Sequence, residues 1–428
     1  MRRRVLVVAE AANPEWVSVP LVGWSHAQAI ARRTDCLVAT QVRNREAWLR
    51  AGKVEGRDFV AIDSEAVARP TTRLGNVLRG GKGKGWTTMT AAAALSYYAF
   101  EWKLWRMLGA EIAAGRFEVV HRVTPLSPTI PSLVLARGCE RAGVPFVVGP
   151  MNGGVPWPRG YDGVRRAERE WLSYVREVYK LLPGYRRTRR QAAALLVASR
   201  DTWQQMPEKY HDKCVYLPEN AVDPERFARV REHAAARPMR VVFVGRLVPY
   251  KGADVLLEAV APLVREGRVC VEVIGDGPQM AALRALVERE RLGDGVTLAG
   301  WVAHEQVQDR MATADVFGFP SIREFGGGVV LEAMAVGLVP VVVGYGGPAE
   351  LVTEQTGVAL PMTDRAGLVE AFRAALAELA AEPGRVDAMS AAARRRVCER
   401  FTWDAKAAVV EQVYEWVLDP SGRRRPVF

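Results

Sequence analysis

The sequence of 428 residues is poor in the residues that build metal and disulfide sites. It has five histidines and five cysteines, and the cysteines, at positions 36, 139, 214, 270 and 398, form no Cys-x-x-Cys pair. This pattern argues against a disulfide framework and a structural zinc site, and it is typical of a reducing cytoplasm. No Asp-x-Asp motif occurs, and the histidines lack ligand spacing. We therefore expect no catalytic metal ion and no other cofactor.

Long uncharged apolar runs are missing as well. A membrane-spanning helix needs about 18 to 20 such residues. The best candidate, residues 91–108, is interrupted by Glu101, Lys103 and Arg106. The apolar run at the N-terminus ends at Glu10, so it is typical of a first β-strand rather than a signal peptide. We expect a cytoplasmic protein.

Two common nucleotide-binding motifs are also missing. The chain has no Gly-x-Gly-x-x-Gly sequence, which leaves nicotinamide dinucleotide binding without support. The stretch GGKGKGWTT at 80–88 does not satisfy Gly-x4-Gly-Lys-Ser/Thr, and no buried strand leads into it. A P-loop is therefore not expected.

What the chain does have is a regular alternation of short apolar runs with longer amphipathic segments. Valine- and isoleucine-rich runs occur in the first half at 4–9, 35–40, 58–62, 117–121, 145–149 and 194–199. They recur in the second half at 240–245, 268–275, 295–300, 315–320 and 339–344. Such runs predict strands buried on both faces of parallel sheets, with helices as crossovers. We therefore expect an α/β protein with two doubly wound, Rossmann-like domains.

The length also favours two domains, and the polar, proline-containing stretch at 220–238 favours a boundary there. We assign residues 1–222 to an N-terminal domain and 223–402 to a C-terminal domain. Residues 403–428 are expected to form a C-terminal helix and basic tail that pack back on the N-terminal domain.

The positive charge is concentrated in the first half of the chain. Residues 1–200 carry 32 Lys and Arg against 16 Asp and Glu, whereas residues 201–428 carry 27 against 32. This asymmetry predicts an acidic partner for the first half, such as nucleic acid, anionic lipid or a phosphate-bearing acceptor. Arginine enrichment that reflects nucleotide composition, giving a solvated basic face, remains the alternative.

The loops that follow strands carry the chemistry expected of a ligand site. Arg246 and Lys251 lie between a predicted strand and helix, and two cations at a helix start suit a diphosphate. Three glycines at 326–328 precede another helix, and Glu324 and Glu332 flank them eight positions apart. Bare amides suit phosphate oxygens, and carboxylates accept hydrogen bonds from vicinal hydroxyls. A nucleotide sugar has both groups.

These motifs resemble the retaining glycosyltransferases of family 4, which have the GT-B fold of two facing Rossmann-like domains with a cleft between them. The resemblance rests on VGRLVPYKG, VIGDGPQMAAL, LAGWV, the Glu-x7-Glu stretch, GGPAELV and the closing FTWDAKAAVVEQVYEW pattern. It covers nearly the whole chain and is specific from about 240 to 355, while the first 200 residues match more loosely.

The resemblance assigns roles to matching positions. It implies catalytic roles for Arg246, Lys251, Glu324 and His121, with the two cations neutralising the leaving diphosphate. Donor-binding positions would be Gly23, Gly245, Trp301, Val302, Phe325, Gly326, Gly327, Gly328 and Glu332, the last of them holding the ribose. The acceptor side would include Asn152, Gly153 and Gly154. Two departures weaken this match: Gly23 is followed by Trp24 instead of a second glycine, and the sequence after His121 lacks the second histidine of the common His-x-His pattern.

The function implied is transfer of a hexosyl unit from a nucleotide diphosphate sugar to an acceptor hydroxyl, with retention of configuration and without a metal ion. A role in cell-surface polysaccharide or glycolipid synthesis follows from the family. The basic first half would hold a sugar or lipid-linked acceptor, and aromatic and basic residues at 97–105 and 176–190 suggest peripheral contact with an anionic membrane. Alternatives are a nucleotide-sugar epimerase, a phosphorylase, or a non-catalytic binder of nucleotide sugar or nucleic acid.

Overall fold

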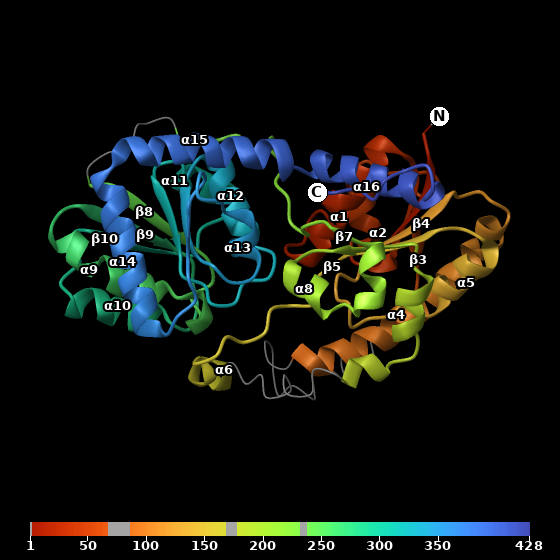
Figure 1. Cartoon of the computed structure of the whole chain (residues 1–428), viewed down its shortest axis with the longest axis horizontal. Helices are drawn as coiled ribbons and strands as arrows, with labels where there is room; N and C mark the ends of the chain where they lie inside the picture. The colour runs from red at the N-terminus through yellow and green to blue at the C-terminus, as the bar shows by residue number, and fades with distance from the viewer. Residues whose placement is uncertain (1, 67–85, 168–177, 232–237) are drawn as a thin grey trace. The chain divides into compact units, whose positions relative to one another are not determined.

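The computed structural model describes residues 2–66, 86–167, 178–231 and 238–428 (Figure 1). The chain divides into two compact units. Unit 1 contains residues 1–154, 165–219 and 403–428, and unit 2 contains residues 155–164 and 220–402. Among the described helices, none combines the length and the apolar character needed to cross a membrane.

Unit 1 is built on a seven-stranded sheet in the order β3-β2-β1-β4-β5-β6-β7, with every pair parallel. The strands are β1 (Arg4–Ala9), β2 (Asp35–Gln41), β3 (Phe59–Ile62), β4 (Val119–Thr124), β5 (Phe146–Met151), β6 (Ala194–Val197) and β7 (Cys214–Tyr216). The helices are α1 (Val19–Arg33), α2 (Arg45–Arg50), α4 (Trp86–Ala113), α5 (Val134–Ala142), α6 (Asp162–Ala167), α7 (Tyr185–Gln191), α8 (Arg200–Gln205) and α16 (Trp403–Leu418); α6 begins in the segment that belongs to unit 2. Short 3-10 turns lie at Val42–Asn44, Val178–Leu181 and Glu208–Lys213.

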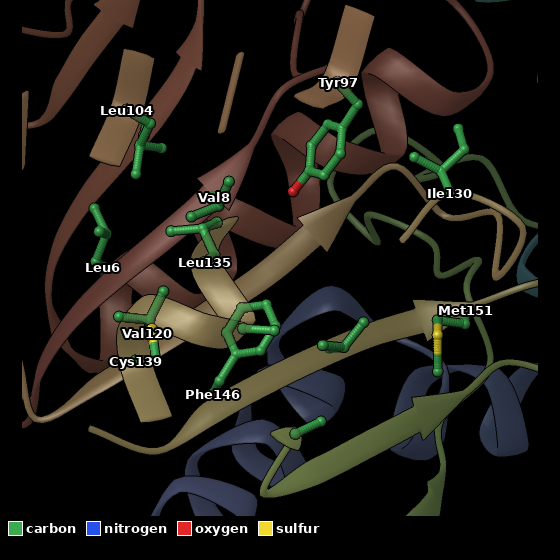
Figure 2. Packing of buried hydrophobic residues seen from close by; sticks show 14 of the residues in the cluster. Leu6, Val8, Tyr97, Leu104, Val120, Ile130, Leu135, Cys139, Phe146 and Met151 are labelled. Atoms are coloured by element: carbon green, nitrogen blue, oxygen red, sulfur yellow. The ribbon is translucent and has the colours of Figure 1, made fainter. Parts of the chain in front are cut away.

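Each face of this sheet carries its own apolar core. Leu6 and Val8 of β1 point toward α4 and α5, where they join Leu104 and Leu135 (Figure 2). The alternate residues of β1 point toward the opposite face and pack with residues of α1 and α16 such as Val410. Alternate side chains of a strand leave on opposite faces, so a continuous apolar run is what a strand covered on both sides requires.

Unit 2 is built on a six-stranded parallel sheet in the order β10-β9-β8-β11-β12-β13. Its strands are β8 (Met239–Val244), β9 (Val269–Ile274), β10 (Val296–Gly300), β11 (Val316–Phe319), β12 (Val339–Val343) and β13 (Val358–Leu360). Its helices are α9 (Ala253–Arg265), α10 (Met280–Arg289), α11 (His304–Met311), α12 (Gly328–Val336), α13 (Gly347–Leu351), α14 (Arg365–Ala381) and α15 (Pro383–Arg400), with a 3-10 turn at Pro249–Lys251. Helices α9 and α14 pack together, as do α12 and α15.

The strand order of both sheets reverses direction once, between β1 and β4 in unit 1 and between β8 and β11 in unit 2. At such a switch point the loops after the two neighbouring strands diverge and leave a crevice, where doubly wound sheets bind their ligands. The predicted fold class, two doubly wound parallel α/β sheets, is confirmed.

The domain limits can be compared with the grouping of residues in the structure. The chain passes from unit 1 to unit 2 after residue 219, three residues before the predicted limit, and the segment 403–428 belongs to unit 1. There α16 packs against α1 (Figure 1). Arg32 and Arg33 of α1 pair with Asp404 and Glu411 of α16.

The predicted domain assignment of residues 155–164 is wrong. The prediction placed them in the N-terminal domain, but they belong to unit 2. The physical reason is a set of contacts with that unit: Arg323 Nε donates to the Val155 carbonyl (3.3 Å), and Tyr161 OH donates to the Thr363 carbonyl (2.9 Å).

Candidate active site

The loops that follow β8 and β11, on either side of the switch point in unit 2, are bonded to each other. The Ile322 amide donates to the Tyr250 carbonyl (3.0 Å), and Ser321 Oγ donates to the same oxygen (3.3 Å). Gly252 has φ +74°, and a Cβ there would lie 2.6 Å from the Pro320 carbonyl oxygen. Only glycine allows both this conformation and this approach, so the sequence itself brings the two loops together.

Lys251 and Glu324 meet across these loops. Lys251 Nζ donates to Glu324 Oε2, and the two side chains keep only 17% and 18% of their exposure. The ammonium group also lies 5.0 Å from the centroid of the Phe319 ring. A cation and a carboxylate predicted from separate motifs therefore form one half-buried pair, in which each is available to a ligand that brings phosphate and hydroxyl groups.

Arg246 lies on the same loop as Lys251. Its side chain is exposed, and within the described part of the chain it makes no hydrogen bond or ion pair. The loop below it is held by the Leu247 amide, which donates to the Asp276 carbonyl (3.0 Å). Arg246 is thus a second cation on a fixed backbone, free to turn toward an anion.

Gly326 and Gly327 precede α12 and Gly328 is its first residue, so the helix begins at the glycines as the spacing predicts. Gly327 has φ +61° and caps the helix without a side-chain hydrogen bond, so the first amides of α12 stay available to a ligand. Glu332 lies one turn into the helix and is half-buried. Burial raises the pKa of this carboxyl to about 7, while Arg226 acts in the opposite direction.

A third loop, after β12, supports the glycine loop from behind. The Gly347 amide donates to the Glu324 carbonyl (3.1 Å). A Cβ on Gly346 would lie 2.5 Å from the Glu324 carbonyl oxygen, and one on Gly347 would lie 2.2 Å from that of Phe325. The backbone that carries Glu324 is therefore fixed by close glycine contacts.

Other predicted donor residues lie on neighbouring strand ends. Gly245 follows β8, and its amide donates to the Ile274 carbonyl of β9 (3.0 Å). Trp301 follows β10, two strands away, and is 76% exposed, while Val302 is half-buried. These positions line the carboxyl edge of the sheet on the β9 and β10 side of the switch point.

Gly23 is a close-packing position in unit 1. It lies in the second turn of α1, where a Cβ would come within 2.1 Å of the Ala11 carbonyl oxygen and 3.0 Å of Thr124 Cγ2. This contact between α1 and the ends of β1 and β4 explains the glycine without a ligand. Its role in donor binding stays a prediction.

His121 lies in the interior of unit 1. The side chain is fully buried. Its Nδ1 is 2.7 Å from Tyr414 OH, and its Nε2 is 2.7 Å from the Gly149 carbonyl oxygen. Because both ring nitrogens are engaged, neither is available to a substrate. The predicted catalytic role of His121 therefore has no support in the geometry, which gives the ring a structural place between β4, β5 and α16.

Asn152, Gly153 and Gly154 follow β5 of unit 1. Asn152 Nδ2 donates to Glu219 Oε2 (2.9 Å), its Oδ1 accepts from the Gly154 amide (3.0 Å), and the Gly153 amide donates to Thr202 Oγ1 (2.9 Å). Sequence reasoning missed Glu219 and Thr202, because nothing local links them to the Asn-Gly-Gly turn.

Sequence reasoning also missed an aromatic cluster in unit 2. The Arg323 guanidinium lies 4.6 Å from the Trp157 ring centroid and 5.0 Å from that of Phe325. Trp157 in turn meets the Tyr250 ring edge-on, with centroids 6.3 Å apart. The signal available was the tryptophan between two prolines in VPWP, but no pattern indicated where it would pack.

In the described residues no three His, Cys, Asp or Glu side chains gather where they could hold a metal ion. What unit 2 offers instead is two cations, a helix start and two carboxylates around one switch point. This set can bind a diphosphate and hydrogen-bond to the hydroxyls on either side of it.

Comparison with known proteins agrees with this geometry. Residues 238–378 match the family model described as "Glycosyl transferases group 1". One relative is the GDP-mannose-dependent alpha-(1-6)-phosphatidylinositol monomannoside mannosyltransferase of Mycobacterium tuberculosis, 36% identical over 212 residues, which cover 45% of this chain and 53% of that protein. The chain thus spans about half the length of the curated relatives it matches.

Solved structures show the same fold over the whole chain. Anabaena HepE in complex with UDP has a TM-score of 0.63 at 14% identity, covering 96% of this chain and 99% of that one. Sucrose-phosphate synthase of Thermosynechococcus elongatus has a TM-score of 0.59 at 17% identity, covering 98% and 100%. The protein has the GT-B fold, and its residues 238–378 are similar to the glycosyl transferases group 1 family.

Proposed function

We propose that this protein is a retaining glycosyltransferase that moves a hexosyl unit from a nucleotide diphosphate sugar to an acceptor hydroxyl. The observation that carries the proposal is the Lys251–Glu324 pair at the switch point of unit 2, beside the glycine-started α12. A structural ion pair would not need an uncapped helix start and a second, exposed cation next to it.

In the proposed reaction Lys251, Arg246 and the amides at the start of α12 bind the diphosphate and stabilise the charge that develops on it. Donors fixed in advance at the site of developing charge are a large source of catalysis. Glu324 accepts hydrogen bonds from the sugar hydroxyls, and Glu332 from the ribose. The acceptor hydroxyl attacks the anomeric carbon on the side of the leaving diphosphate, whose oxygen takes the proton. No metal ion takes part.

The donor is tested first with GDP-mannose, because the mycobacterial relatives are named for that donor. The experiment is a thermal-shift and donor-hydrolysis screen of GDP-, UDP- and ADP-sugars, each with and without EDTA. We expect one sugar nucleotide to raise the melting temperature and to be hydrolysed slowly at an equal rate in EDTA. Stabilisation by none of them would refute the donor site, and loss of hydrolysis in EDTA would refute metal independence.

The acceptor is proposed to be a sugar or a lipid-linked sugar held by unit 1, at the cytoplasmic face of an anionic membrane. Support comes from α4, where Leu95 (58% exposed) and Trp102 (50% exposed) share a face with Arg106, whose guanidinium lies 4.8 Å from the Trp102 ring. Leu181 is 82% exposed, and the nearby Pro183 carbonyl accepts from Tyr98 of α4 (2.7 Å). Of the basic stretch 176–190, residues 176 and 177 lie outside the described residues.

Liposome co-sedimentation tests this surface. We expect binding to vesicles with anionic lipid at physiological salt and a loss of binding in Trp102→Ala, because apolar insertion and charge attraction act together. Equal recovery of the protein with anionic and with neutral vesicles would remove the membrane from the proposal.

A further inference from the structure

Residues 155–161 lie along the carboxyl ends of four strands of unit 2. Val155 accepts from Arg323, after β11; the Pro156 carbonyl accepts from Tyr345 OH (3.0 Å), after β12; and Tyr161 OH donates to the Thr363 carbonyl, after β13. The Trp157 ring meets Tyr250, after β8. This segment, called the strap below, therefore touches the loops after β11, β12 and β13 on one side of the switch point and the loop after β8 on the other. These include both loops that carry the Lys251–Glu324 pair.

Trp157 is the centre of these contacts. Its ring lies against the Arg323 guanidinium (4.6 Å), and Arg323 is the residue next to Glu324. On another side it meets Tyr250, the residue next to Lys251. One side chain thus touches the immediate neighbours of both members of the pair.

The backbone of the strap is rigid, which suits it to hold the neighbouring loops in place. Prolines at 156 and 158 flank Trp157 and restrict both their own φ and the residue before each. Arg323 lies between two aromatic rings, Trp157 and Phe325, and also donates to the strap backbone. A guanidinium over the face of an aromatic ring is attracted by the ring's quadrupole. The loop before Glu324 is therefore held by the strap as well as by the close contacts of Gly346 and Gly347.

We propose that Trp157 is a positioning residue of the donor site: through Arg323 it holds the Glu324 carboxylate where it meets the donor's sugar hydroxyls. The inference rests on the proposed function and goes beyond it. It gives a residue from the N-terminal half of the sequence a part in sugar recognition, while diphosphate recognition stays with Lys251, Arg246 and α12.

The test compares two ligands that differ only in the sugar. Dissociation constants for the nucleotide sugar identified by the donor screen, and for the matching nucleoside diphosphate, are measured by calorimetry for the wild type, Trp157→Ala and Trp157→Phe. We expect Trp157→Ala to weaken the nucleotide sugar about tenfold and the nucleoside diphosphate less than twofold. Trp157→Phe keeps a ring for Arg323, and we expect it to recover most of the loss. The matched control is Arg159→Ala, an exposed residue of the same segment, which should behave as the wild type.

The outcomes separate the two proposals. Equal weakening of both ligands by Trp157→Ala would mean a merely structural role, and unchanged binding of the sugar nucleotide would mean no role; either overturns the inference and leaves the proposed function standing. A wild type that binds no sugar nucleotide would overturn both. If Trp157→Ala fails to fold, Arg323→Met, which removes the guanidinium and keeps the aliphatic chain, should give the same selective loss.

Discussion

Lys251 is the side chain whose removal tests the proposed chemistry most directly. We expect Lys251→Ala to lower kcat/KM for donor cleavage about 100-fold, the effect of removing one donor from a preorganised anionic site. The melting temperature should also fall, because Lys251→Ala leaves the mostly buried Glu324 carboxylate without its cation. Steady-state kinetics and calorimetry measure the two effects. Lys209→Ala, at an exposed position of unit 1, is the control. A large loss of stability with little loss of rate would make the pair structural.

Glu332 is expected to give the proposed donor site a dependence on pH. Its pKa is raised to about 7 by burial, so the carboxyl is largely protonated below that value and loses acceptor capacity for the ribose hydroxyls. We expect the affinity for the nucleotide to rise as the pH increases from 6 to 8, and Glu332→Gln to flatten that profile. Titration calorimetry at a series of pH values measures it. A wild-type profile as flat as that of the variant would contradict the role given to Glu332.

The residues that could be predicted from sequence are those whose role depends on local backbone. Lys251, Glu324 and Gly327 lie between a strand and the α-helix that follows it, and these positions can be inferred from hydrophobic periodicity and glycine spacing. The role of Trp157 could not be predicted, because its partners Tyr250 and Arg323 lie 93 and 166 residues after it in the sequence. Only the fold brings them together. His121 shows a different limit: the sequence pattern placed it at the end of a strand, whereas β4 continues to Thr124. The direction of its ring depends on Tyr414, from the last helix.

At the scale of elements, the loop after β12 is expected to control the position of the glycine loop. In Gly347→Ala the new Cβ would lie 2.2 Å from the Phe325 carbonyl oxygen, and backbone must shift to relieve it. We expect donor affinity to fall at least tenfold, since displacements of about 1 Å in a site can cost that much or more. The control is Gly384→Ala in α15, where a Cβ meets nothing within 4 Å. Equal affinities for the two variants would show that the loop after β12 does not set the site.

The strands were predictable and their connections were not. Apolar runs of mainly Val and Phe in β8, β11 and β12 predict buried strands, because a strand covered on both sides must be apolar on both faces. The strap is different: residues 155–161 contain two prolines and no periodic pattern, so the sequence gives no reason to assign them to unit 2. Their place depends on single contacts made by Val155, Trp157 and Tyr161, which only the folded unit provides.

At the scale of the whole molecule, the chain joins its two units by four passages, after residues 154, 164, 219 and 402. Unit 1 is therefore not complete until α16 has been added, and its core contains Val410, Val413 and Tyr414 from that helix. Removal of residues 403–428 would expose the face of the sheet that they cover and leave His121 without the Tyr414 hydroxyl. The two-domain prediction followed from length and strand pattern, but this closure by the last helix depends on packing between distant segments.

Unit 1 is expected to be the acid-sensitive part of the molecule. His26 and His121 are fully buried. Desolvation lowers the pKa of His121 from 6.5 to about 4 and that of His26 well below 6.5, with Lys406 adding to the effect on His26 and Arg122 to that on His121. As the pH falls, the unfolded chain binds protons at these sites before the folded chain does. The contribution of the two histidines to the free energy of unfolding is therefore fully present above pH 6.5 and is lost as the pH decreases toward 4. For His121 alone the loss is about 3 kcal/mol.

Scanning calorimetry between pH 7 and 4 measures this loss. His26→Leu should reduce the slope, because both ring nitrogens of His26 lack a hydrogen-bond partner among the described residues and an apolar residue has no charge to acquire there. His211→Gln is the control, since His211 is only partly buried, and it should retain the wild-type slope. If His26→Leu and His211→Gln lost stability in parallel with the wild type, the acid sensitivity would have to come from groups other than His26.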